Sequence, residues 1–221
     1  MYLSSTPGIV KALASQMTWK GPERNAHGRP VVYLTFDDGP HPEITREALA
    51  ILAEHDAKAT FFCVGSNVAT HPDVMEELRL GGHQVANHTH NHCSGWQTPN
   101  RAYFRSFLDA QALLPSNVSQ FRPPYGRITR SQAEAIGKRA EIVMWDALSR
   151  DWDTKLTASD CLGSLQRHTA PGSIVVFHDS VKAAPRMLPS LPAYLKWLTK
   201  NGYSVELLPS RQENQPSLFP A

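Results

Sequence analysis

The sequence has few cysteines and no long apolar segment. Only Cys63, Cys93 and Cys161 occur among 221 residues, and no two of them form a C-x-x-C pair. This odd count argues against a disulfide framework and against a cysteine zinc site, so we expect three free thiols. No window is apolar over the length of a membrane-spanning helix, and residues 1–20 lack the basic start and unbroken apolar stretch of a secretory signal. We therefore expect no membrane span and, by default, a cytoplasmic protein.

An excess of charge of one sign is also missing. Lys and Arg number 22 against 20 Asp and Glu, a formal net charge of +2. This balance gives no reason to expect nucleic acid or an anionic membrane as a partner. Ile9, Leu13 and Met17 recur every four residues, which is compatible with a helix on a membrane surface. A short helix covering one end of the domain is favoured, because the stripe is narrow and few basic residues flank it.

Strand-like and helix-like segments alternate along most of the chain. Strands are expected at residues 31–36, 60–64, 84–87, 120–122, 142–145, 173–177 and 203–208. Helices are expected at residues 42–55, 72–80, 101–114, 129–139, 159–167 and 189–200. About seven βα units without a break in composition predict one α/β domain, either a barrel or an open doubly wound sheet.

The placement of polar residues favours the barrel. Reactive side chains follow the expected strands, and in a barrel all these strand ends meet on one face. We expect a distorted (β/α) barrel at residues 30–209. Residues 1–29 are expected to be an N-terminal extension that packs on it, and residues 210–221 a loose tail.

Two adjacent carboxylates and a pair of histidines give the strongest chemical signal. Asp37 and Asp38 end the first strand, so one can face a metal while the other faces a bound water; a turn before Gly-Pro is the alternative use of such a pair. His88 and His92 share one face if their segment is helical, and both can then reach one ion. His90 would face away from that ion.

Further candidates follow later strands. Arg122 could orient a carboxylate through a forked pair, and the two prolines after it could fix the direction of the Tyr125 N–H, an oxyanion donor. His178 could act as a general acid if a carboxylate keeps it protonated, with Asp151 as the candidate partner and Asp179 as the alternative.

The remaining expectations concern the walls of the site and the core. The side chains expected to form a small apolar wall are Trp152, Val176 and Pro124. His83 follows two glycines and is expected to bond the backbone in the core.

These residues together resemble the NodB-like polysaccharide deacetylases, carbohydrate esterase family four. The five motifs of that family occur in order as TFDDG at 35–39, HTxxH at 88–92, RPPYG at 122–126, DW at 151–152 and VFHD at 176–179. The resemblance spans about residues 31–208. It implies a distorted (β/α) barrel and a metal-dependent hydrolase that removes acetyl groups from N-acetylated sugars.

The resemblance also assigns roles. It implies one divalent ion, with zinc expected and cobalt or manganese as alternatives, on Asp38, His88 and His92. It implies Asp37 as base and His178 as acid. It implies Arg122 as the residue that orients the base and Asp151 as the partner of the acid. The Tyr125 N–H is implied as the oxyanion donor. The fourth motif departs from the family, because Leu148 stands where an acidic residue is common and the nearest acid is Asp146.

The expected partner is an acetylated carbohydrate of chitooligosaccharide or peptidoglycan type, and the expected state is a monomer. Three alternatives remain at this point. The first is an O-acetyl esterase on xylan-like sugars, and the second is a catalytically inactive sugar-binding barrel. The third is a non-haem iron oxygenase with a two-His, one-carboxylate site.

Overall fold

A computed structural model describes residue 8 and residues 14–210 of the chain. Its strands are β1 Val31–Asp37, β2 Thr60–Cys63, β3 Gln84–Asn87, β4 Gln120–Phe121, β5 Glu141–Ile142, β6 Ala147–Leu148, β7 Ile174–His178 and β8 Ser204–Val205. Its helices are α2 Ile44–Glu54, α3 Gly65–Thr70, α4 Pro72–Leu80, α5 Asn100–Gln111, α6 Arg130–Ile136, α7 Ala158–His168 and α8 Ala184–Lys200, with a 3₁₀ turn, η1, at Pro124–Gly126.

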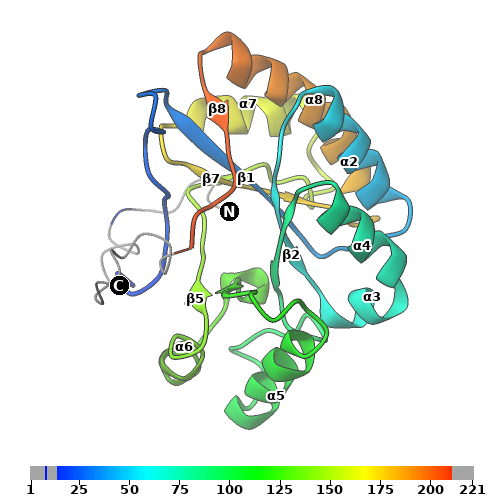
Figure 1. The fold of residues 1–221 in the computed structure, drawn as a ribbon, viewed down its shortest axis with the longest axis vertical. Coiled ribbons are helices and arrows are strands. Elements are labelled where there is room, and N and C mark those ends of the chain that lie inside the picture. The colour runs from blue at the N-terminus through cyan, green and yellow to red at the C-terminus, as the bar shows by residue number, and fades with distance from the viewer. Residues whose placement is uncertain (1–7, 9–13, 211–221) are drawn as a thin grey trace, which may run out of the picture.

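The strands form one curled parallel sheet with the order β5-β4-β3-β2-β1-β7-β6, and β8 pairs with β1. The helices lie on the outside of this sheet (Figure 1). The expected distorted (β/α) barrel in a single domain is confirmed. Because every pairing is parallel, the carboxyl ends of the strands meet on one side, and the register sets Asp37 level with His178 of β7 and Phe62 of β2.

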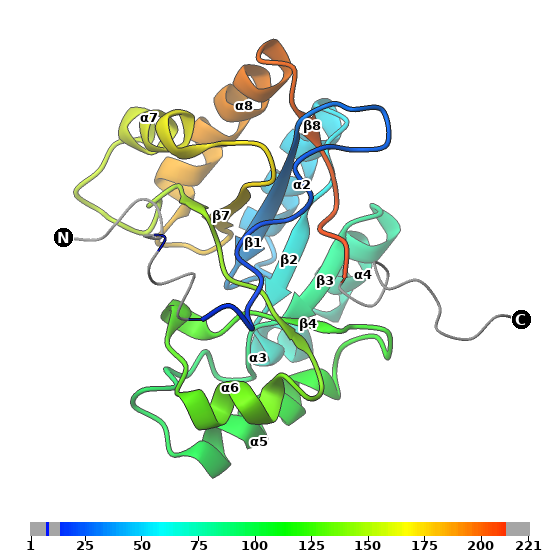
Figure 2. The ribbon, with the colours of Figure 1, turned by 90° about the vertical axis from the view of Figure 1, so that its left-hand side faces the viewer.

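The barrel is not closed by strand pairing between β5 and β6, which end the sheet order. Part of the predicted N-terminal extension runs beside β5 and beside the residues that precede β7. The Thr18 N–H donates to the Ile142 carbonyl at 2.8 Å, and the Gly21 N–H donates to the Gly172 carbonyl at 2.9 Å. Figure 2 shows this segment crossing in front of the central strands. It supplies backbone partners that the short edge strand β5 would otherwise lack.

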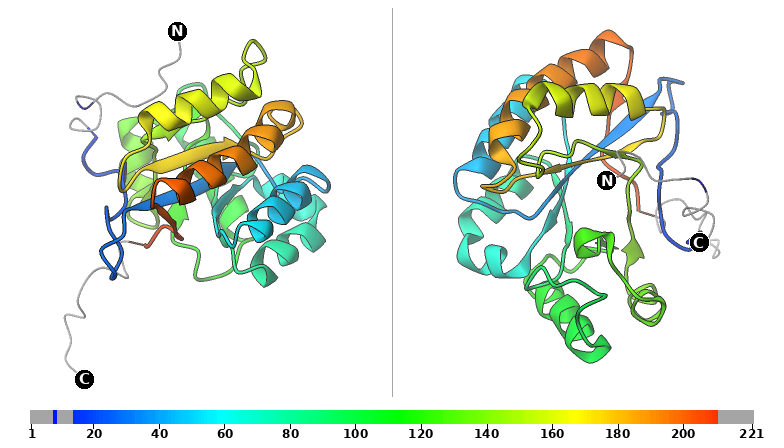
Figure 3. Two further views of the ribbon diagram at one scale, coloured as in Figure 1. Left: turned by 90° about the horizontal axis from the view of Figure 1, so that it is seen from above. Right: turned by 180° about the vertical axis from the view of Figure 1, so that it is seen from behind.

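The largest core cluster lies between the sheet and the surrounding helices, and a smaller one lies on the inner face of the sheet. Every residue of β1 is buried, as expected for a central parallel strand covered on both faces. The Phe36 ring stacks on Phe61 at 4.8 Å and on Phe177 at 5.7 Å between centroids, which ties β1 to β2 and β7. Figure 3 shows α7 (yellow) and α8 (orange) side by side over this part of the sheet.

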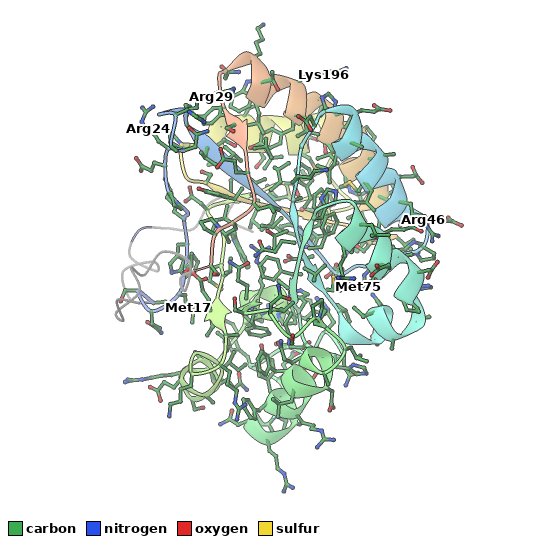
Figure 4. The ribbon with its side chains drawn as sticks, in the orientation of Figure 1. Met17, Arg24, Arg29, Arg46, Met75 and Lys196 are labelled. Atoms are coloured by element: carbon green, nitrogen blue, oxygen red, sulfur yellow. The ribbon has the colours of Figure 1, made fainter. Side chains whose placement is uncertain are left out.

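Charged side chains lie on the outer helix faces. Arg46 of α2 bonds Asp73 and Glu77 of α4, each at 2.7 Å, and Figure 4 shows it pointing away from the core. The helices of the described segment are too short or too polar to cross a membrane.

Several element boundaries differ from the expectations, and the helices expected at 101–114 and 129–139 each end three residues earlier. The strand expected at 142–145 stops at Ile142, and the chain pairs again only in β6. Helix α3 was not expected, because six residues carry little periodicity. Helix α8 begins at Ala184 and contains three prolines, two of them in its interior; burial of Met187 and Leu191 in the core outweighs the backbone bonds lost at those two. The last strand spans only two residues.

Two expectations fall outside the described residues. They concern the apolar stripe at Ile9 and Leu13 and the expected tail at residues 211–221.

Candidate active site

The predicted site residues converge at the carboxyl ends of the strands. A pocket of about 520 Å³ is lined by Asp37, Asp38, His88, His92, Tyr125, Arg127, Trp145, Leu148, Trp152, Val176, His178, Ser180 and Lys182. Arg122 and Asp151 lie behind this lining with no exposed surface. Pro124 is buried in η1 and is not among the lining residues.

Asp38, His88 and His92 meet in this pocket. One nitrogen from each imidazole and one Asp38 oxygen all lie within 4.8 Å of one another. The Asp38 Oδ1 atom is 3.1 Å from His92 Nε2 and 3.9 Å from His88 Nε2. Two imidazole nitrogens and a carboxylate are a donor set that zinc accepts, so these residues could hold one divalent ion.

The protonation states suit metal binding. Burial lowers the pKa of His88 to about 4, so its imidazole is neutral at neutral pH. His88 Nδ1 lies 2.7 Å from the Arg122 carbonyl oxygen, which can only accept; Nδ1 therefore carries the proton and Nε2 faces Asp38 with its lone pair. For Asp38, burial would raise the pKa, but the His92 hydrogen bond and the charges of His178 and His88 hold it far below its usual range.

His88 and His92 reach the site from a loop. The helix that would place both on one face is absent. Thr89 and His92 have positive φ values of 62° and 51°. The Asn87 side chain accepts the Thr89 N–H at 2.9 Å, and the Ser106 carbonyl accepts the His90 N–H at 2.9 Å. Left-handed residues held in this way bend the chain until His88 and His92 face one point.

Asp37 is held by a buried arginine. Arg122 Nη1 donates to Asp37 Oδ1 at 2.6 Å and to Thr35 Oγ1 at 2.7 Å. The forked pair that we expected is wrong, because Nη2 and Nε donate instead to the carbonyls of Met144 and Val143 at 3.0 and 3.3 Å. Arg122 thus fixes one carboxylate oxygen and spans the strands around the site.

His178 is paired with Asp151, as predicted, and not with Asp179. Its Nδ1 atom lies 2.8 Å from Asp151 Oδ1, and its backbone N–H donates to Asp151 Oδ2 at 2.8 Å. Burial alone would lower the pKa of His178, but the charge and hydrogen bond of Asp151 outweigh it and raise the pKa to about 9. His178 is therefore protonated at neutral pH. The Trp152 ring packs against it at 5.0 Å between centroids.

Asp179 is a functional candidate that we had treated only as an alternative partner of His178. Its Oδ1 accepts the Gly39 N–H at 3.0 Å, its Oδ2 lies 2.5 Å from Thr45 Oγ1, and its own N–H donates to the Asp37 carbonyl at 3.1 Å. Burial, with the charge of Asp38, raises the pKa of Asp179 to about 7. These bonds attach the end of β7 to the turn that carries Asp37 and Asp38.

The sequence matches a known family. The family model described as polysaccharide deacetylase matches residues 24–144, more than half of the chain. The chain belongs to the polysaccharide deacetylase family. It is 32% identical over 206 residues to a peptidoglycan-N-acetylglucosamine deacetylase of Bacillus cereus, covering 86% of this chain and 74% of that one. It is 35% identical to a chitooligosaccharide deacetylase of Sinorhizobium fredii, covering 71% of this chain and 75% of that one.

Solved structures agree with the sequence matches. A peptidoglycan N-acetylglucosamine deacetylase in complex with 4-naphthalen-1-yl-N-oxidanyl-benzamide superposes with a TM-score of 0.82 at 26% identity, over 92% of this chain and 95% of that one. A family 4 carbohydrate esterase from Streptomyces lividans, in complex with acetate, gives a TM-score of 0.74 at 25% identity, over 81% and 93%. This protein is thus a polysaccharide deacetylase with the NodB-type barrel.

The structure adds one residue, Asn67, that the sequence did not suggest, and a new role for Asp179. The Asn67 side chain, from α3, donates to the Asp38 carbonyl at 2.8 Å. The Asp179 carboxylate accepts the N–H of Gly39, the next residue of the same turn. Asn67 gave no signal in the sequence, because α3 is short and nothing places it near residue 38.

His83 accepts the Ala59 N–H at 3.2 Å, which confirms its expected core role.

Proposed function

We propose that this deacetylase removes N-acetyl groups from poly- or oligosaccharides that contain N-acetylglucosamine, and that it needs one divalent ion to do so. Zinc is the proposed ion, with cobalt or manganese as alternatives. The observation that carries the proposal is the meeting of Asp38, His88 and His92 within 4.8 Å, with Asp37 fixed beside them by Arg122.

The proposed ligands fit such an ion in charge and in protonation. Asp38 is ionised, and the buried His88 is neutral, the states in which both bind a metal. When bound there, a divalent ion polarises the acetyl carbonyl and makes a water molecule more acidic. No other described residues form a comparable cluster of His, Cys, Asp and Glu side chains.

The protein residues provide the proton transfers. Asp37 takes a proton from the water that attacks the acetyl carbon, and its bond to Arg122 keeps one oxygen in place while the other receives that proton. The Tyr125 N–H donates to the oxygen that gains negative charge. His178, kept protonated by Asp151, gives its proton to the sugar nitrogen as the carbon–nitrogen bond breaks. Acetate and a free amine are the products.

The walls of the pocket select the acyl group. Trp152, Val176 and Leu148 line it with apolar surface. Leu148 stands where the fourth motif of the family commonly has an acidic residue. This wall is therefore more apolar than that motif predicts. The acetyl methyl group can pack against these side chains, and a longer acyl chain would meet them.

A panel of acetylated sugars tests the proposal. Metal-loaded protein is incubated with chitooligosaccharides, peptidoglycan fragments and acetylated xylan, with and without a chelator. The masses of the products are measured by mass spectrometry. We expect loss of acetyl groups from the amide substrates, and no loss in the chelated samples. Release from acetylated xylan alone would overturn the N-acetyl assignment in favour of an O-acetyl esterase. Full activity in the chelated protein would overturn the metal requirement.

A further inference from the structure

A row of ring and guanidinium contacts leads from the proposed metal centre to the protein surface. The Tyr125 ring centroid lies 4.6 Å from that of His92. The Arg127 Cζ atom lies 5.9 Å from the Tyr125 centroid and 5.3 Å from that of Trp96. We call Tyr125, Arg127 and Trp96 the outer strip. Trp96 is 66% exposed and Tyr125 61%, so both rings offer apolar surface to a ligand.

The outer strip is fixed in place by the backbone. The Trp96 indole N–H donates to the Ile128 carbonyl at 3.2 Å. The Gly95 N–H donates to the Arg127 carbonyl at 3.0 Å, and a Cβ at Gly95 would lie only 2.5 Å from that oxygen. Gln132 Nε2 donates to the Gly95 carbonyl at 3.0 Å. These bonds join the loop of Trp96 to the loop of Arg127, so little ordering is needed when a ligand binds.

The mouth of the pocket is cationic. Arg127 and Lys182 are part of the lining, and within the described residues neither side chain forms an ion pair with a carboxylate. The carboxylates of the lining are Asp37, which is bonded to Arg122, and Asp38, which faces the two histidines. The outer part of the site therefore presents positive charge that no described carboxylate pairs.

We propose that the outer strip is a subsite for the sugar next to the N-acetylglucosamine that loses its acetyl group, and that it favours a neighbour carrying a carboxylate. This inference rests on the proposed function. The C–H face of a sugar ring can pack on the exposed Trp96 ring. The Arg127 guanidinium can bind the carboxylate in a forked geometry, and Lys182 adds a second positive charge.

The chemistry separates two kinds of chain. A neutral chitin-type oligosaccharide can use only the aromatic surface of the outer strip. A chain in which N-acetylglucosamine alternates with a sugar bearing a free lactyl-ether carboxylate, as in a peptidoglycan glycan strand without its stem peptides, can use both the aromatic surface and the cations. The assigned preference is therefore for the acidic chain.

Binding measured without turnover tests this preference. The metal-loaded Asp37→Asn protein is titrated by calorimetry with a tetrasaccharide of the acidic chain and with the same tetrasaccharide after its carboxylates are converted to amides. We expect the acidic form to bind at least about threefold more tightly, as for a solvent-accessible ion pair, and the ratio to shrink in added salt. Equal affinities at low salt would overturn the proposal.

Variants then locate the effect. In the Asp37→Asn background, Arg127→Gln is expected to bring the ratio of affinities close to one, and Arg127→Lys to keep part of it. Arg130→Gln, three residues away on an exposed helix face, is the control and should keep the full ratio. Trp96→Ala should weaken both tetrasaccharides alike, and Trp96→Phe should restore part of that loss.

Two results separate this inference from the function on which it rests. A ratio that Arg127→Gln leaves unchanged would remove Arg127 from the subsite. Wild-type protein that releases no acetate from either chain, with the affinity ratio intact, would instead overturn the proposed reaction and leave the subsite standing.

Discussion

Asp37 and Asp38 are adjacent in the chain, but their side chains meet different partners. Asp38 Oδ1 faces the ring nitrogens of His92 and His88, whereas Asp37 Oδ1 accepts from Arg122. A positive φ of 85° at Asp38 turns the chain sharply after the strand, so that the two carboxylates separate. Asp38 can thus bind the proposed ion while Asp37 accepts a proton.

Replacing Asp37 tests its proposed role as base. In Asp37→Asn the side chain keeps its size and an oxygen for Arg122, but it can no longer take up a proton. We expect kcat to fall by about 10²–10⁴-fold with bound metal unchanged, measured by acetate release and elemental analysis on the same samples. A variant with near wild-type turnover would show that Asp37 is not the base.

Replacing Asp151 tests how His178 is kept protonated. An acid must hold its proton, so activity is present below the pKa of His178 and is lost as the pH rises through it. Asp151→Asn removes the charge that raises this pKa, so the alkaline limb of kcat/KM should move to lower pH, by about 1–3 units. The pH–rate profile of both proteins measures this, and superimposable alkaline limbs would count against the pairing.

At the scale of elements, turns and loops place the side chains that the strands bring near the site. Strand β1 was predictable from its apolar run, and five short motifs located most of the site. The bends in the loops were not predictable, because the loop that contains Thr89 and His92 is held partly by a residue distant in sequence, Ser106, whose carbonyl accepts the His90 N–H. The same holds for Arg122, whose other donors are used by carbonyls of a neighbouring segment.

The bond between Asp179 and Gly39 joins two of these elements. In Asp179→Ala the Gly39 N–H and Thr45 lose their partner, and the turn with Asp38 is free to shift. We expect zinc affinity to fall by about 10-fold or more in protein with unchanged circular dichroism, as for other residues that support a metal ligand. Asp179→Asn, which keeps an acceptor for Gly39, is the matched control and should retain most of the affinity. Wild-type zinc affinity in Asp179→Ala would contradict the positioning role.

At the scale of the whole molecule, the barrel gathers residues from across the sequence into one pocket. The proposed ligands come from the ends of β1 and β3, and the acid comes from the end of β7. Alternation of strands and helices predicted this convergence. The side-chain pattern did not predict the crossing of residues 18–21 beside β5, because that segment has backbone partners and little apolar periodicity.

An ion shared by two strand ends should also stabilise the fold. Zinc at about 100 times its Kd contributes about 2.7 kcal/mol if it binds only the folded chain. For a domain of this size the melting temperature should rise by roughly 5–10 °C, measured by calorimetry on chelated and zinc-loaded protein. Identical melting temperatures would contradict a metal site at these strand ends.

The most direct test of the central claim is the zinc content of two histidine variants. His92 faces Asp38 Oδ1 at 3.1 Å, whereas His90 lies in the same loop but outside the cluster. Elemental analysis after zinc loading and dialysis should find close to one zinc per chain in the wild type and in His90→Ala, and almost none in His92→Ala. One zinc per chain retained in His92→Ala, or loss of zinc in His90→Ala alone, would contradict the account.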